Sequence, residues 1–233
     1  MSKLLLAFPL SMVMTAACGL ISSDIATVKF ALPERTYSFD TAKAGWNLPP
    51  ATLPDIACTD DAGCCTLAMV AVPGVNCNMV ICDAMKCAVK VTVETPPQTI
   101  NLKMEANLGS LNKQSAIDVT VSKIAYDVTT NTMNVDLPPV ELFVAPDGTT
   151  TASDSAAKRF GTVPTIPAAT PVTNGNVTLD PVGQEAFVGF AHNFSTPFVF
   201  LARTSVIVPA GSPLPMGAVE IKIKGQLSAK PSL

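Results

Sequence analysis

Apolar and polar residues alternate with a period of two along several stretches of this chain. The pattern is clearest at 28–32, 100–104, 117–121 and 219–224. Successive side chains of a strand point to opposite faces of its sheet, so each stretch predicts a strand with one buried and one solvated face. Antiparallel sheets have this arrangement. We find no long stretch with the periodicity of an amphipathic helix.

Short strands separated by Pro and Gly residues are therefore expected along most of the chain. We place them at 26–32, 36–40, 88–94, 99–106, 116–128, 132–137, 140–145, 177–180, 186–192, 197–202, 204–208 and 217–228. Their number and spacing predict an all-β fold. The expected architecture is an antiparallel β-sandwich formed by one domain over residues 26–233, and a closed β-barrel is the alternative.

The strand expected at 116–128 carries a finer prediction. Its apolar phase shifts by one residue between Val121 and Ile124, which predicts a bulge or a bend. Before the shift, Val119 is expected to face the core and Thr120 the solvent. By contrast, residues 146–176 are rich in Thr, Ala, Ser, Pro and Gly and are expected to form a long loop.

Residues 55–90 read as a cysteine-rich insertion into the sandwich. They hold six cysteines, in the pattern C-x5-CC-x11-C-x4-C-x4-C: Cys58, Cys64, Cys65, Cys77, Cys82 and Cys87. The pattern lacks the C-x2-C pairs and nearby histidines of a zinc site, which favours three disulfides over a metal centre. Six cysteines allow 15 connectivities, but the adjacent Cys64 and Cys65 are expected to have different partners.

The same insertion has an acidic character. It resembles short acidic cysteine-rich modules of exported proteins, a likeness that covers about 30 residues and specifies no ligand. Asp55, Asp60 and Asp61 are weak calcium candidates, because they lack the ordered spacing of a calcium loop and its bidentate Glu. The apolar run 67–72 is expected to pack on the sandwich or to form a strand.

The first 18 residues have the order of a secretory leader. Lys3 precedes an apolar run of eleven residues at 4–14, which is about half the length needed to cross a bilayer. Thr15-Ala16-Ala17-Cys18 follows and resembles the lipobox of bacterial lipoproteins, although that family usually has Leu where this chain has Thr15. The resemblance implies a signal peptide at 1–17, a lipidated Cys18 and a short tether at 18–25.

Cysteine parity supports this interpretation of the leader. The chain has seven cysteines, and lipidation of Cys18 would leave an even number to pair in an oxidising compartment. The resemblance implies a membrane partner through the lipid anchor and a place in the cell envelope. Gly19 follows Cys18 where some bacteria use Asp as an inner-membrane retention signal, so the outer membrane is the default expectation.

Composition limits the remaining function classes. Apolar residues make up 48% and charged residues 14% of the 233 residues, with a formal net charge of −3. A chain of this composition can bury a large core and is not disordered. It is not basic enough to bind nucleic acid by neutralising phosphates. The apolar character permits a pocket for a lipid-like ligand but is equally consistent with a large core or a partner interface.

Catalytic motifs are not apparent in the sequence. His192 is the one histidine and has no Gly-x-Ser-x-Gly motif with it, so we expect it not to be catalytic. No cofactor motif is present either, and five phenylalanines over 187–200 are expected to pack in the core. Three functions stay open, in this order: a non-enzymatic envelope protein for adhesion, assembly or scaffolding with an envelope partner, a carrier or sensor of an apolar ligand, and a hydrolase that uses carboxylates.

Overall fold

The structure, a computed structural model, describes residues 27–43, 52–71, 75–105, 117–193 and 195–231. The leader expected at 1–17, Cys18 and the tether expected at 18–25 lie outside the described residues. None of the helices in the described part of the chain is long and apolar enough to span a bilayer.

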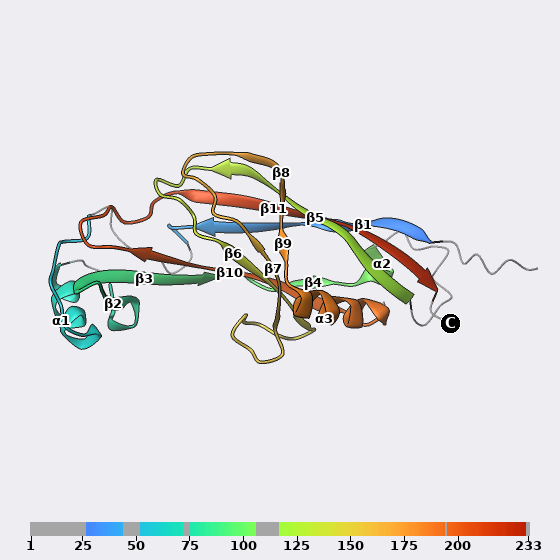
Figure 1. Cartoon of the computed structure of the whole chain (residues 1–233), viewed down its shortest axis with the longest axis horizontal. Helices are drawn as coiled ribbons and strands as arrows, with labels where there is room; N and C mark the ends of the chain where they lie inside the picture. The colour runs from blue at the N-terminus through green and yellow to red at the C-terminus, as the bar shows by residue number, and fades with distance from the viewer. Residues whose placement is uncertain (1–26, 44–51, 72–74, 106–116, 194, 232–233) are drawn as a thin grey trace, which may run out of the picture.

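Two antiparallel sheets face each other and are not closed into a barrel, which confirms the predicted all-β sandwich (Figure 1). The smaller sheet has the spatial order β1 (Val28–Asp40), β11 (Ala218–Pro231), β5 (Ile117–Asn131) and β8 (Val172–Asn176). The seven-stranded sheet has the order β2 (Val80–Asp83), β3 (Lys86–Glu94), β10 (Phe198–Val208), β6 (Val140–Pro146), β7 (Lys158–Val163) and β9 (Thr178–Leu179), with β4 (Gln98–Ile100) paired to β10.

The inner faces of both sheets form the main core, and β5 shows how the pattern sets the register. Val119 is 5% exposed, whereas Thr120 points to solvent. Val121 pairs with Leu227 and Lys123 with Gln226, so Ser122 is an extra residue on β5. This bulge returns the apolar side chains to the inner face at Ile124, as predicted.

The apolar stretch expected as a strand at 186–192 is instead the helix α3 (Pro181–His192). Local chemistry explains where it starts. Asp180 accepts a hydrogen bond from the Val182 amide at 3.0 Å. The first helical residue is a proline, which has no backbone N–H, so no donor is left without an acceptor at this position. Gly183, Phe187 and Ala191 are buried at a spacing of four residues, which is one face of a helix.

The apolar run at 67–72 was expected to pack on the sandwich or to form a strand. Its residues up to Ala71 instead form the last part of a helix, α1 (Asp61–Ala71). The strand expected at 99–106 is shorter and is followed by one helical turn, α2 (Leu102–Glu105). Residues 132–137 form no strand, and Leu137 alone makes an isolated bridge to Ile166. A short 3-10 turn lies at Cys77–Met79.

The stretch 146–176 is not one long loop, because it contains β7 and β8. Its first part, 147–157, and the connection at 164–171 are irregular, and the 147–157 loop covers part of the outer face of the seven-stranded sheet. Ala152 of this loop joins Phe143, Ala145, Val199 and Leu201 in a second, smaller apolar cluster.

The two ends of the elongated molecule differ in content (Figure 1). At one end lie α1, β2 and the start of β3, which carry the cysteines. The start of β1 and the end of β11 lie at the opposite end, and α2 lies toward it. Two pairs of expected strands are each one strand in the structure. β1 runs through Pro33, where its register with β11 shifts, and β10 covers the two strands expected at 197–208.

Candidate functional site

The six cysteines of residues 55–90 are all paired in the structure. The disulfides are Cys58–Cys82, Cys64–Cys87 and Cys65–Cys77. Neighbouring Cys64 and Cys65 have different partners, as the sequence predicted. Two of the bonds join the segment at Cys58 and the helix α1 to the β2–β3 hairpin, where Cys82 and Cys87 face each other in register. The hairpin is therefore held from both of its strands.

Three sulfur atoms of this module form the group of potential metal ligands found in the described part of the chain. The Sγ atoms of Cys58, Cys64 and Cys87 lie within 4.8 Å of one another. Each belongs to a disulfide, and a disulfide sulfur is not the thiolate that binds zinc. In this oxidised form the sulfur cluster is a structural staple.

The three calcium candidates have separate roles. Asp55 pairs with the Lys86 ammonium at 2.8 Å. Asp60 accepts the Gly63 amide at 2.7 Å at the start of α1, and Asp61 accepts the Cys82 amide at 2.6 Å. Within the described residues the three carboxylates are not gathered into one ligand set. Their hydrogen bonds cap the helix and fasten it to the hairpin.

The tip of the β2–β3 hairpin presents an apolar side chain to solvent. Ala84 and Met85 both have positive φ, 50° and 61°, and the Met85 side chain is 77% exposed. This left-handed backbone is disfavoured for residues with a side chain. The adjacent disulfides and the hydrogen bond from the Cys58 amide to the Met85 carbonyl, at 3.1 Å, hold the turn in place.

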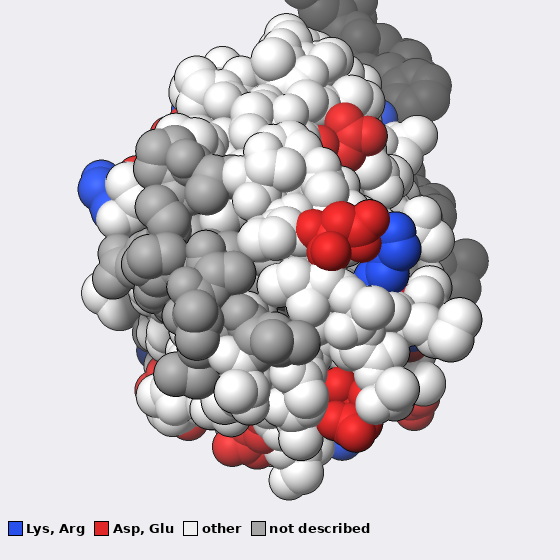
Figure 2. Space-filling model, turned by 90° about the vertical axis from the view of Figure 1, so that its left-hand side faces the viewer, with Lys and Arg blue, Asp and Glu red and all other residues white. Residues whose placement is uncertain are grey.

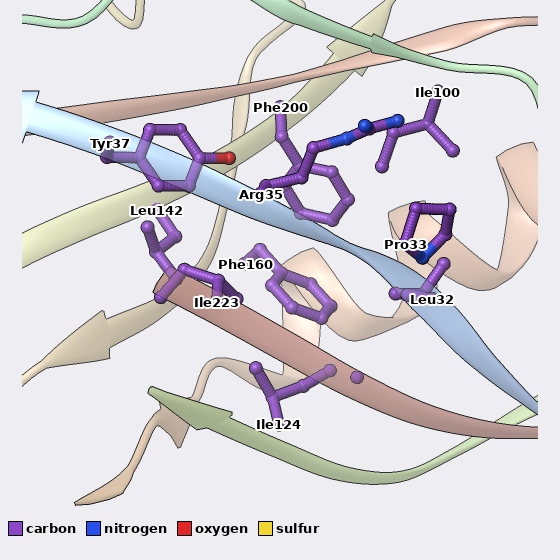
Figure 3. A pocket seen from close by; sticks show the side chains of 11 residues that line it. Leu32, Pro33, Arg35, Tyr37, Ile100, Ile124, Leu142, Phe160, Phe200 and Ile223 are labelled. Atoms are coloured by element: carbon purple, nitrogen blue, oxygen red, sulfur yellow. The ribbon is translucent and has the colours of Figure 1, made fainter. Parts of the chain in front are cut away.

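The space between the two sheets is nearly filled. A cavity of about 20 Å³ lies beside Arg35 and Tyr37 of β1, with Ile124, Phe160 and Phe200 among its apolar walls (Figure 3). That volume is enough for about one water molecule, whereas ligand sites span roughly 300–1,000 Å³. Hollows of about 320–380 Å³ in the described part of the molecule open onto its outer surface.

The two polar side chains beside this cavity, Arg35 and Tyr37, have the hydrogen bonding and burial of structural residues. The Arg35 Nη2 atom donates to the Thr99 carbonyl at 3.2 Å, and Gln98 Nε2 donates to the Thr36 carbonyl at 2.6 Å. These bonds join β1 to β4 across the sandwich. Burial raises the pKa of the Tyr37 phenol well above its usual range, and the nearby Arg35 charge offsets this only in part. Tyr37 therefore stays neutral at physiological pH.

The expected phenylalanine cluster packs in the core. Phe187, Phe198 and Phe200 have ring centroids 5.6–5.9 Å apart, and Phe190 stacks on Phe198 at 6.0 Å. Phe160 of β7, which the sequence reasoning did not include, contacts Phe187 at 5.3 Å. Such tilted and edge-to-face pairs are the favoured geometry of a packed aromatic core. Phe194 lies outside the described residues.

Carboxylates on the outer face of the seven-stranded sheet are occupied by arginines. Arg203 lies 2.8 Å from Glu141 and 4.0 Å from Glu94, and its guanidinium stacks 4.8 Å from the Phe143 ring centre. Glu94 also accepts the Ala152 amide at 3.2 Å. This network fastens the 147–157 loop over the second apolar cluster.

A second arginine extends the network to α3. Arg159 lies 2.9 Å from Asp180 and 3.5 Å from Glu141. The hydrogen bond from Arg159 is the main reason that the pKa of Asp180 is lowered, and the Val182 and Gly183 amides contribute. Asp180 therefore stays ionised where it caps the helix, which favours the helix N-terminus.

His192 is the last residue of α3, at the end of the molecule away from the cysteines. Its Nδ1 atom lies 3.7 Å from Asp118, and Lys230 contacts the other Asp118 oxygen at 3.9 Å. The imidazole and the carboxylate are each 48% exposed. The residue thus sits on an open surface, and that His192 is not catalytic stays a prediction.

Comparisons with known proteins give no family for this chain. No family profile matches it, and no curated protein matches it. A solved structure from Desmodium yellow mottle tymovirus aligns over 100% of this chain and 97% of that chain, with 9% identity and a TM-score of 0.26. A likeness at that level carries no argument about fold or function.

Proposed function

We propose that this protein is a lipid-anchored component of the cell envelope, held at the membrane by Cys18. In this proposal the β-sandwich has no catalytic role and is presented for adhesion, assembly or scaffolding with an envelope partner. The outer membrane is the favoured location, because Gly19 follows Cys18.

The observation that carries the proposal is the pairing of the cysteines. Six of the seven are joined in three disulfides within residues 58–87. Such bonds persist in oxidising compartments outside the cytoplasm. Cys18 is the seventh, and it directly follows the lipobox-like segment. Acylation of Cys18 would give every cysteine of the chain a chemical role, and two or three acyl chains are enough for stable anchoring.

The packing of the sandwich favours presentation over transport or catalysis. The cavity of about 20 Å³ between the sheets is too small for a lipid-like ligand. The described residues therefore give no support to the hypothesis that the protein carries or senses an apolar ligand. The carboxylates Glu94 and Glu141 are engaged by Arg203. A rigid body with a disulfide-braced, exposed tip at Met85 suits contact with another macromolecule.

Intact-mass measurement of the protein extracted from membranes tests the anchor. We expect a mature chain that begins at Cys18 and carries the mass of its acyl chains. The Cys18→Ser variant should lose that modification, while Cys65→Ser, which breaks a disulfide of the body, should keep it. An unacylated chain with a different first residue in the membrane fraction would refute the proposal.

A further inference from the structure

We infer that the end of the sandwich opposite the disulfides rests on an anionic phospholipid surface. We call this end the basal face and define it by Lys29, Lys103, Met104, Asp118, His192 and Lys230. The inference rests on the proposed anchor at Cys18 and adds an orientation and a lipid class to it. The disulfide end, defined by Asp55, Asp60, Asp61, Asp83 and Lys86, would then point away from the bilayer.

Strand register brings the basal residues together. Lys230 near the end of β11 is in register with Asp118 near the start of β5, and Lys29 near the start of β1 faces Ser228. The helix α3 ends here at His192, and α2 adds Lys103 and Met104 at the same end of the molecule (Figure 1). Residues distant in sequence thus gather toward one end of the molecule.

The charge of this face is positive. Three exposed lysines stand against two acidic residues, Asp118 and Glu105 of α2, and Asp118 is already contacted by Lys230 at 3.9 Å and by His192 at 3.7 Å. Neither Lys29 nor Lys103 has an ion-pair partner among the described residues. Next to Lys103, the Met104 side chain is 82% exposed. A lysine beside an exposed apolar side chain suits an interface that has phosphate headgroups above acyl chains.

The opposite end has the reverse charge. Four aspartates stand there against Lys86, and Figure 2, which looks onto this end, shows acidic groups scattered over a mostly uncharged surface. An anionic membrane repels this end and attracts the other. Since the two ends lie along the long axis, the charge separation favours an upright molecule.

The position of Cys18 allows the contact. Val28, the first residue of β1, lies ten positions after Cys18, and ten residue steps span at most about 35 Å. The tether therefore lets the basal face reach the bilayer surface, and electrostatic attraction holds the face there once it lies within a Debye length of about 8 Å. Each lysine near an anionic surface contributes about 1 kcal/mol, or roughly fivefold in the population of the bound orientation.

Lysine reactivity on vesicles tests the orientation with the intact, acylated protein. The protein is reconstituted in vesicles of phosphatidylcholine alone or with phosphatidylglycerol, and acetylation of each lysine is followed by mass spectrometry. We expect Lys29 and Lys103 to react several-fold more slowly on the anionic vesicles. Exposed Lys90, on the outer face of β3, is the internal control and should keep its rate.

Charge reversal provides the matched variants. Lys29→Glu with Lys103→Glu should abolish the difference between vesicle types at Lys230, whereas Lys90→Glu with Lys158→Glu should leave it unchanged. High salt should also abolish it. Equal rates on both vesicles, or slowing at Lys90 as well, would overturn the inference. The mass of the same sample distinguishes the two possible failures. If the protein is acylated and the rates are equal, only the proposed orientation is wrong. If the protein is not acylated, the proposed anchor is wrong.

Discussion

Two glycines of α3 offer a direct test of how this helix is docked. A Cβ atom added to Gly183 would lie 1.9 Å from the Arg159 carbonyl oxygen and 2.4 Å from the Phe160 Cα. Both are backbone atoms of β7, so no side chain can move aside to make room. A Cβ added to Gly189 meets nothing within 4 Å. Gly183 thus marks the closest approach of the helix to the sheet.

The two alanine variants should therefore change stability in opposite directions. Alanine stabilises a helix interior by up to about 1 kcal/mol relative to glycine, and this gain should appear undiminished in Gly189→Ala. In Gly183→Ala, overpacking costs about 1–3 kcal/mol or more and exceeds that gain. For a domain of this size, 1 kcal/mol corresponds to roughly 2–4 °C in Tm. We expect a Tm that rises slightly for Gly189→Ala and falls by several degrees for Gly183→Ala.

Thermal unfolding followed by circular dichroism, with urea unfolding as a second measure, decides the matter. If both variants were stabilised, α3 would not be packed against β7 through Gly183. Equal destabilisation of both would point to a strand or an irregular segment at 181–192, and the placement of the phenylalanine core around Phe187 would have to be revised.

Three further predictions follow from burial, covalent bonding and charge. Val119→Asp, which buries a charge, should destabilise by several kcal/mol, while Thr120→Asp should stay within about 0.5 kcal/mol; equal Tm values would refute the register of β5. Replacing Cys64 and Cys87 together by Ala should cost about 2–5 kcal/mol in urea unfolding, and an unchanged midpoint would refute the bracing role of this bond. A hydrogen bond from a lysine ammonium lowers the pKa of Asp127, so its stabilising effect should be complete above about pH 4 and lost as pH falls through the lowered pKa. The difference in urea midpoint between wild type and Asp127→Asn should therefore shrink between pH 5 and pH 2, and a constant difference would contradict this.

The strands with one solvated face were predictable because their pattern has a direct physical cause. Along β5 and β11, polar side chains alternate with apolar ones and so identify the solvated face of each strand. Even the bulge at Ser122 shows in the sequence, as a one-residue shift in this alternation. The edge strand β8 shows no such pattern, because four of its five residues are Thr, Asn or Gly and none is fully buried. Its sequence therefore predicts part of a loop, and its pairing with β5 depends on tertiary contacts.

The helix α3 was missed although its signals are in the sequence. Asp180-Pro181 is a helix start, and the spacing of Gly183, Phe187 and Ala191 is helical. The apolar residues between them resemble a buried strand when read alone. The disulfide partners, by contrast, were not available from sequence, since spacing alone leaves 15 connectivities open. The cation–aromatic contact of Arg203 with Phe143 likewise depends on the pairing of β10 with β6.

The apolar composition of the chain is explained by burial on both faces of the seven-stranded sheet. Its inner face packs on the other sheet, and part of its outer face is covered by the 147–157 loop, which Arg203 and Glu94 fasten in place. A mean hydropathy of +0.38 therefore requires no ligand pocket. The described surface instead has its most exposed large apolar side chains, Met104 at 82% and Met85 at 77%, at opposite ends of the molecule. With the basal face on the membrane, Met104 contacts lipid and Met85 is left as the apolar contact available to a partner.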